Sequence, residues 1–213
     1  MNKQEKWATV DLYPVITPEF CKGRTSEYVL EEVLKAGVKA VQLRMKSQSD
    51  AEYLATALNF RKLTLDYGAM LIIDDRIDVA LASKADGVHL GQEDFSLKYA
   101  VEIAPDLIYG ISTHSYEEAV KAEKDGATYI NVGPIFKTGT KQTPMPFLGT
   151  DILKEIIPHI NIPFTVMGGI KRDNIEEVLE KGAKIVAMVT EITQADNIFE
   201  TVSELRKIIL SYR

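Results

Sequence analysis

The sequence predicts an α/β fold, a single-domain (β/α)8 TIM barrel that spans residues 1–213. Short apolar segments alternate with segments of helical pattern, and strict alternation of this kind produces a parallel sheet. The apolar segments are continuous rather than alternating, as expected for strands that are covered on both faces. A glycine that can end a helix stands directly before an expected strand at four places, Gly37, Gly68, Gly126 and Gly182.

Two folds are compatible with this alternation, a closed barrel and an open doubly wound sheet. Eight strand–helix units in 213 residues fit a compact barrel near the lower end of the usual size. An open sheet that binds a dinucleotide would carry G-x-G-x-x-G after its first strand, and no such motif follows residues 12–17. The sequence therefore favours the barrel.

The elements were placed in chain order from apolar runs and from their end signals. The expected strands are residues 12–17, 38–44, 69–73, 87–90, 107–111, 129–132, 163–167 and 185–189. Ser49 with Glu52 and Ser115 with Glu118 form capping-box patterns at helix starts, and Pro105 follows a helix end. The expected helices begin near residues 25, 49, 77, 97, 115, 152, 173 and 198.

The composition and net charge limit the kinds of partner and metal site that this protein can have. The formal net charge is −6 and no basic block exists, which argues against nucleic acid or an anionic membrane surface as the main partner. The one cysteine, Cys21, excludes an internal disulfide and a cysteine-rich metal site. Residues 1–10 hold no apolar signal region and no run approaches a membrane span, so we expect a cytoplasmic protein. A homodimer is left open.

Unusual polar residues follow seven of the eight expected strands. They are Gln42, Arg44 and Lys46; Asp74, Asp75 and Arg76; Gln92 to Asp94; Ser112 to His114; the loop from Gly133 to Lys141; Gly168 and Gly169; and Thr190. In a barrel of this class the chemistry lies at the carboxyl ends of the strands. The sequence therefore predicts a binding site at this rim, with local cationic groups for an anionic ligand.

The charged groups also have structural explanations. Gln42, Arg44 and Lys46 alternate, so they can face one side together, or they can form a solvated strand end with a salt bridge. Asp75 and Asp94 follow neighbouring strands, so they can jointly hold Mg²⁺, or each can cap a helix. Both explanations stay open at this point.

The loops that carry glycine are similarly ambiguous. The loop from Gly133 to Lys141 carries hydroxyls, amines and a glycine that lets the backbone come close to a ligand, all of which suit a phosphate. The alternative is an ordinary polar surface loop. Gly168, Gly169 and Thr190 match the phosphate site that barrels of this class often have after their last two strands. The alternative is that the two glycines form a tight turn between a strand and a helix. For His89 and His114, packed structural roles are favoured over acid–base roles.

Six segments together carry a family resemblance. They are Gln42-Leu43-Arg44-Met45-Lys46, Asp74–Asp78, Gly87–Asp94, Gly110–His114, Gly133–Lys141 and Gly168–Ile170. In order, and over nearly the whole chain, they resemble the thiamine-phosphate synthase family. The resemblance implies an Mg²⁺-dependent (β/α)8 transferase that acts on small molecules. It would join 4-amino-2-methyl-5-hydroxymethylpyrimidine diphosphate to 4-methyl-5-(2-hydroxyethyl)thiazole phosphate and release pyrophosphate by a dissociative displacement.

The resemblance also implies roles for individual residues. The implied catalytic residues are Arg44, Lys46, Ser112 and Lys141, and the implied metal ligands are Asp75 and Asp94. The implied substrate-binding residues are Gln42, Leu43, Arg44, Met45, Lys46, Asp74, Ser112, Thr138, Gly139, Thr140, Lys141, Gly169, Val189 and Thr190. The loop at residues 137–147 is expected to order when ligands bind.

Two positions depart from the family pattern. Thr190 stands where the family has serine, and its hydroxyl keeps the hydrogen-bonding capacity. Asp74 stands where the family has asparagine, which adds a negative charge beside the expected pyrophosphate. Asp74 can pair with Arg76 or Arg44, join Asp75 in the metal site, or accept hydrogen bonds from the next helix; the metal-linked role is favoured.

Two other functions compete with the synthase. A thiazole tautomerase of the same fold lacks the metal carboxylates and relies on a histidine near the position of His114. A non-catalytic paralogue would bind thiamine phosphates as a regulator. Retention of Asp75, Asp94, Lys46 and Lys141 favours the synthase over both.

Overall fold

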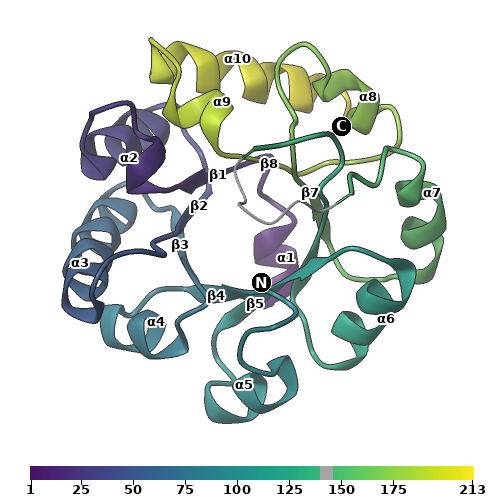
Figure 1. The fold of residues 1–213 in the computed structure, drawn as a ribbon, viewed down its shortest axis with the longest axis horizontal. Coiled ribbons are helices and arrows are strands. Elements are labelled where there is room, and N and C mark those ends of the chain that lie inside the picture. Colours follow the sequence, from purple (N-terminus) through teal and green to yellow (C-terminus); the bar gives the residue numbers. More distant parts are fainter. Residues whose placement is uncertain (140–145) are drawn as a thin grey trace.

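A computed structural model, which describes residues 1–139 and 146–213, confirms the (β/α)8 barrel. The strands close into one parallel barrel in chain order, from β1 to β8 (Figure 1). Their bounds are β1 (Leu12–Ile16), β2 (Ala40–Leu43), β3 (Met70–Asp74), β4 (Gly87–Leu90), β5 (Ile108–Thr113), β6 (Tyr129–Val132), β7 (Phe164–Val166) and β8 (Val186–Met188). Each strand coincides with one expected run.

Helices form the outer layer around this barrel (Figure 1). Their bounds are α2 (Ser26–Lys35), α3 (Asp50–Asp66), α4 (Ile77–Ser83), α5 (Leu97–Ile103), α6 (Tyr116–Lys124), α7 (Ile152–Ile156), α8 (Ile175–Leu179), α9 (Thr190–Thr193) and α10 (Ile198–Ser211), with the short 3₁₀ helices η1 (Pro18–Phe20) and η2 (Ile157–His159). No helix within residues 1–139 and 146–213 is long and apolar enough to cross a membrane.

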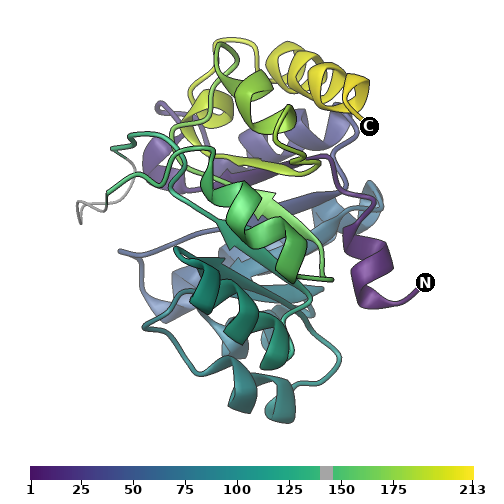
Figure 2. The same ribbon diagram turned by 90° about the vertical axis from the view of Figure 1, so that its right-hand side faces the viewer.

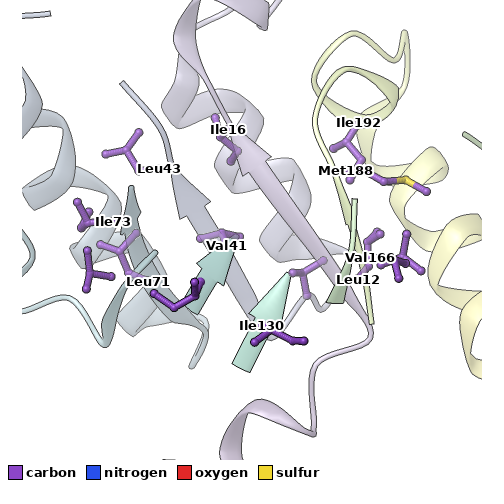
Figure 3. Close-up of a cluster of buried hydrophobic side chains, with 14 of the residues drawn as sticks. Leu12, Ile16, Val41, Leu43, Leu71, Ile73, Ile130, Val166, Met188 and Ile192 are labelled. Carbon is purple, nitrogen blue, oxygen red and sulfur yellow. The ribbon is translucent and has the colours of Figure 1, made fainter. Parts of the chain in front are cut away.

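The main hydrophobic core lies between the strands and the helix ring. Leu43, Leu71 and Ile73 belong to it, and Figure 3 shows them beside residues from β1, β6, β7 and β8. These side chains alternate along each strand with residues that face the barrel interior. The continuous apolar runs of the sequence therefore supply two different cores.

The barrel interior is the second core, and the first helix closes it from below. α1 (Lys3–Trp7), which the sequence analysis did not anticipate, lies at the end of the barrel opposite the loop after β6 (Figure 2). Asn2 and Glu5 form its capping box. Trp7 is fully buried and stacks on Tyr129, with ring centroids 3.7 Å apart. α1 therefore covers the amino-terminal end of the barrel and not the carboxyl ends of the strands.

Candidate active site

The end of β2 delivers the cationic groups of the site. Gln42 is buried inside the barrel, where its Nε2 donates a hydrogen bond to Tyr13 Oη at 3.0 Å. Arg44 Nε and Lys46 Nζ lie 3.6 and 3.1 Å from Asp74 Oδ2. The side chains of Leu43 and Met45 instead pack in the outer core, so only their backbone atoms can contribute to binding.

Two carboxylates at the end of β3 meet these cations. Asp75 forms an ion pair with Lys46. Its backbone has φ of 60°, a left-handed conformation that aspartate tolerates better than most residues, and its N–H donates to His89 O at 2.8 Å. The structure therefore turns Asp75 away from the path of β3 and toward the rim.

Asp74 is the most deeply buried carboxylate of this group. Its side chain is nine-tenths buried, and burial raises the pKa of the Asp74 carboxyl, while Lys46 and Arg44 oppose that shift. Asp74 Oδ2 is compensated by charge rather than by a well-aligned hydrogen bond, since Lys46 Nζ lies 3.1 Å and Arg44 Nε 3.6 Å from it. The pairing with Arg44 that the sequence left open is therefore present in the structure.

The helix-cap explanations for the carboxylates are wrong. α4 begins after Arg76 and has no side-chain cap, so neither Asp74 nor Asp75 caps it. Arg76 pairs instead with Asp50 and Asp78, and is not the partner of Asp74.

Asp94 stabilises the turn that follows β4. Its Oδ2 accepts a hydrogen bond from the Gly91 N–H at 2.6 Å, whereas Ser96 is the N-cap residue of α5. The negative charge of Asp94 contributes to raising the pKa of Asp74, which places the two carboxylates within electrostatic reach of each other. Asp94 thus faces the same rim as Asp74 and Asp75.

Ser112 lies beside this cluster at the end of β5. Its Oγ is 2.9 Å from His89 Nε2, and its backbone carbonyl accepts a hydrogen bond from Gln92 Nε2 at 2.6 Å. His114 Nδ1 lies 2.5 Å from Gly133 O, which ties the histidine to the start of the loop after β6. Both histidines therefore have structural partners, as the sequence analysis favoured.

The opposite side of the rim is built from backbone. Gly168 and Gly169 have φ of 103° and 64°, and a Cβ atom at Gly169 would lie 2.5 Å from Lys137 O. The Phe136 N–H donates to Gly168 O at 2.9 Å, so the turn after β7 packs tightly on the loop after β6. Thr138 and Gly139 continue that loop, whereas Thr140 and Lys141, with the rest of 140–145, lie outside the described residues.

Val189 and Thr190 complete this side at the end of β8. Both are partly exposed, and Val189 is the residue that precedes α9. Thr190 follows a strand as expected, and a short helix that the sequence pattern did not indicate begins there. The rim thus has a charged side and a side of backbone groups and hydroxyls.

The family model described as thiamine monophosphate synthase matches residues 12–192. The chain belongs to the thiamine-phosphate synthase family. The thiamine-phosphate synthase of Dictyoglomus thermophilum is 40% identical over 217 residues, which cover 100% of this chain and 97% of that protein. The thiamine-phosphate synthase of Shouchella clausii is 45% identical over 88% of this chain and 90% of that protein.

Solved structures agree with this thiamine-phosphate synthase family assignment. The thiamine phosphate pyrophosphorylase of Pyrococcus furiosus has a TM-score of 0.88 and 37% identity, with 99% of both chains covered. A 3-hexulose-6-phosphate synthase has a TM-score of 0.67 at 17% identity, and that likeness shows the fold alone. The chain is therefore an enzyme of this family, a transferase on a (β/α)8 barrel.

Sequence reasoning missed the polar residues inside the barrel of this synthase family member. Tyr13 and Tyr129 join their hydroxyls at 2.9 Å, and Asn131 Oδ1 accepts from Thr165 at 2.6 Å. Each lies in an expected strand, where it reads as part of an apolar run. The available signal was an asparagine in a continuous apolar strand, because such a residue needs a buried partner.

Proposed function

We propose that this enzyme condenses 4-amino-2-methyl-5-hydroxymethylpyrimidine diphosphate with 4-methyl-5-(2-hydroxyethyl)thiazole phosphate to give thiamine phosphate and pyrophosphate. The observation that carries the proposal is the position of Arg44 and Lys46 beside Asp74 and Asp75 at the open rim of the barrel. Family membership supports it, because full-length relatives are named thiamine-phosphate synthase.

The proposed reaction breaks the C–O bond between the pyrimidine methylene carbon and the diphosphate, and the bonding electrons leave with pyrophosphate. The pyrimidine ring delocalises the positive charge left on the methylene carbon. The thiazole nitrogen then donates its lone pair and forms the new C–N bond. No protein nucleophile is consumed and no strong general base is needed.

The role assigned to the cationic residues follows from where charge develops. Negative charge grows on the leaving pyrophosphate, so cations that are already in place lower the barrier. Arg44, Lys46 and Lys141 are proposed to supply them. Gln42 and Ser112 are proposed to hold the pyrimidine diphosphate, with the backbone of Leu43 and Met45.

Asp75 and Asp94 are proposed to hold Mg²⁺ together with oxygen atoms of the diphosphate. Carboxylates are suitable ligands for this hard cation, and the buried carboxylate of Asp74 shares Lys46 with Asp75. No group of three or more His, Cys, Asp or Glu residues suited to a metal occurs in residues 1–139 and 146–213. Substrate oxygens would therefore complete the coordination, and the ion would neutralise charge on the leaving group.

The backbone side of the rim is proposed to hold the thiazole phosphate. Gly169, Val189 and Thr190 lie there with Thr138 and Gly139, and Thr140 is assigned to the same subsite. Partly exposed hydroxyls and backbone N–H groups suit a phosphate. The two substrates would then approach each other across the mouth of the barrel.

Gly169→Ala tests this phosphate subsite. The new methyl group must displace the Lys137 carbonyl, so we expect the KM for thiazole phosphate to rise about tenfold, or roughly 1.4 kcal/mol. Gly68→Ala is the matched control, since Gly68 has the same φ of 64° but no atom within 4 Å of the added carbon. An equal KM in both variants would contradict the assignment.

Asp74→Asn tests the proposed link between Asp74 and the ion. We expect the Mg²⁺ concentration for half-maximal activity to rise about tenfold, with near-normal kcat at saturation, because one carboxylate charge is lost. Asp50→Asn, which removes an exposed carboxylate paired with Arg76, serves as the control. An unchanged Mg²⁺ curve with tighter pyrophosphate binding would instead make Asp74 a tolerated repulsive neighbour.

The competing functions make different predictions. A tautomerase would use a histidine near the position of His114 for proton transfer, and the contact of His114 Nδ1 with Gly133 O leaves its Nε2 available, so turnover has to separate the two functions. A regulator would bind both substrates without turnover. The deciding experiment mixes both substrates with Mg²⁺ and measures thiamine phosphate, which only the synthase forms from them.

A cytoplasmic location, the absence of a nucleic-acid partner and the option of a homodimer remain predictions from the sequence.

A further inference from the structure

A continuous chain of hydrogen-bonding side chains crosses the barrel interior below the site. It links Gln42 Nε2 to Tyr13 Oη at 3.0 Å, and Tyr13 Oη to Tyr129 Oη at 2.9 Å. From Tyr129 Oη it continues to His89 Nδ1 at 3.0 Å, and from His89 Nε2 to Ser112 Oγ at 2.9 Å. One end, Ser112, is partly exposed at the rim, and the rest is buried.

The number of hydrogens available to donate sets the direction of this chain of hydrogen bonds. Gln42 Nε2 can only donate, so Tyr13 Oη accepts there and has one hydrogen left to give. Within the described part of the chain, Tyr13 Oη contacts only Gln42 and Tyr129, so its hydrogen goes to Tyr129 Oη. Tyr129 then gives its own hydrogen to His89 Nδ1. The opposite direction would leave a buried Tyr13 hydroxyl hydrogen without an acceptor, which is costly.

The direction of these hydrogen bonds determines the tautomer of His89 and the hydrogen-bonding role of Ser112. His89 Nδ1 is an acceptor, so the ring proton of the neutral imidazole lies on Nε2 and is donated to Ser112 Oγ. Ser112 Oγ therefore already accepts a hydrogen bond. Its own hydrogen remains to be donated toward the open rim.

We propose that the chain from Gln42 through Tyr13, Tyr129 and His89 positions Ser112 as a hydrogen-bond donor to the substrate. Tyr129 and His89 are positioning residues in this scheme, and they act through Ser112. The substrate part rests on the proposed function, in which Ser112 meets the pyrimidine diphosphate, so the recipient is an acceptor atom of that substrate. The histidine tautomer does not depend on that function.

The surroundings keep this chain neutral and rigid. Burial raises the pKa of both Tyr13 and Tyr129 well above the ordinary value, so both hydroxyls keep their hydrogens. Trp7 stacks on the Tyr129 ring, with the ring planes 9° apart, and meets Tyr13 edge-on. α1 thereby packs against the chain of hydrogen bonds from the amino-terminal end of the barrel.

Tyr129→Phe tests the proposal, since it removes the hydroxyl link and keeps the ring that Trp7 packs against. The readout is the ¹⁵N spectrum of histidine-labelled enzyme without substrate, with the His89 signals assigned by their loss in His89→Asn. The wild type should show His89 protonated on Nε2 and accepting at Nδ1. In Tyr129→Phe the two neutral tautomers should mix, because Nδ1 has lost its donor.

Kinetics supply the second readout. Tyr129→Phe should raise the KM for the pyrimidine diphosphate about three- to tenfold, as for the loss of one oriented hydrogen bond. The KM for thiazole phosphate should stay unchanged. Tyr109→Phe is the matched control, because Tyr109 is equally buried but donates to Ala100 O and Ala104 O, outside the chain. It should leave both the His89 tautomer and the KM at their wild-type values.

The outcomes separate this inference from the proposed function. Wild-type His89 protonated on Nδ1 would overturn the direction of the chain, and it can be read even if Tyr129→Phe fails to fold. An unchanged tautomer in a folded Tyr129→Phe would overturn the role of Tyr129. Absence of thiamine phosphate from the wild-type reaction would reject the proposed function, while the tautomer result would still decide the direction.

Discussion

Replacing Asp75 with asparagine is expected to lower kcat by roughly 10²–10³-fold, the usual cost of losing one preorganised electrostatic contact in a transition state. Asparagine keeps the size of the side chain and tolerates the left-handed backbone at φ 60°, so the barrel should remain intact. Two losses combine in this variant. The proposed ion loses a ligand, and Lys46 loses one of its two ion-pair partners and keeps Asp74.

The measurement is kcat and KM for both substrates across a range of Mg²⁺ concentrations. Asp78→Asn is the matched control, since Asp78 is an exposed carboxylate on α4 that pairs with Arg76 and not with Lys46. It should leave kcat within about twofold of the wild type, as for most exposed ion pairs. A wild-type kcat in Asp75→Asn, or full activity of the wild type after exhaustive chelation, would refute the metal assignment.

Truncating Trp7 to alanine is expected to destabilise the enzyme by about 3–5 kcal/mol. The side chain is fully buried, and it fills the amino-terminal end of the barrel between Tyr13 and Tyr129. The indole Nε1 has no hydrogen-bond partner among the described residues, so packing rather than hydrogen bonding supplies its contribution. Removing the indole would leave a cavity against the face of the Tyr129 ring.

Denaturant unfolding of the two proteins measures this free energy directly. Phe199→Ala is the control, because Phe199 is 42% exposed on α10 and should cost far less. A loss for Trp7→Ala no larger than that for Phe199→Ala would show that α1 does not support the barrel. Because Trp7 lies at the end opposite the catalytic rim, any folded Trp7→Ala should retain Mg²⁺ dependence.

The positions of the strands and most helices could be predicted because their signals are local. Ser49 and Glu52 form the complete capping box that their spacing indicates. Ser115 caps α6 as expected by accepting from the Glu118 N–H, although the Glu118 side chain accepts from the backbone N–H of His114 rather than from that of Ser115. The same kind of signal, Asn2 three residues before Glu5, marks α1 and was overlooked in a segment that has a single turn of helix.

The sequence by itself also determined which residues gather at the rim, because parallel strands bring their carboxyl ends to one edge. It could not decide what each side chain does there. The pairing of Lys46 with Asp75 depends on the left-handed turn at Asp75, and the burial of Asp74 depends on the neighbouring strands. These are properties of the assembled rim.

The chain of hydrogen bonds from Gln42 to Ser112 depends on the tertiary structure alone. Tyr13 and Tyr129 are 116 residues apart, and each lies in a run whose neighbours are apolar. Local propensity and periodicity report which face of a strand a residue occupies. They do not report which residues face each other across a closed barrel, because that depends on the register and closure of all the strands together.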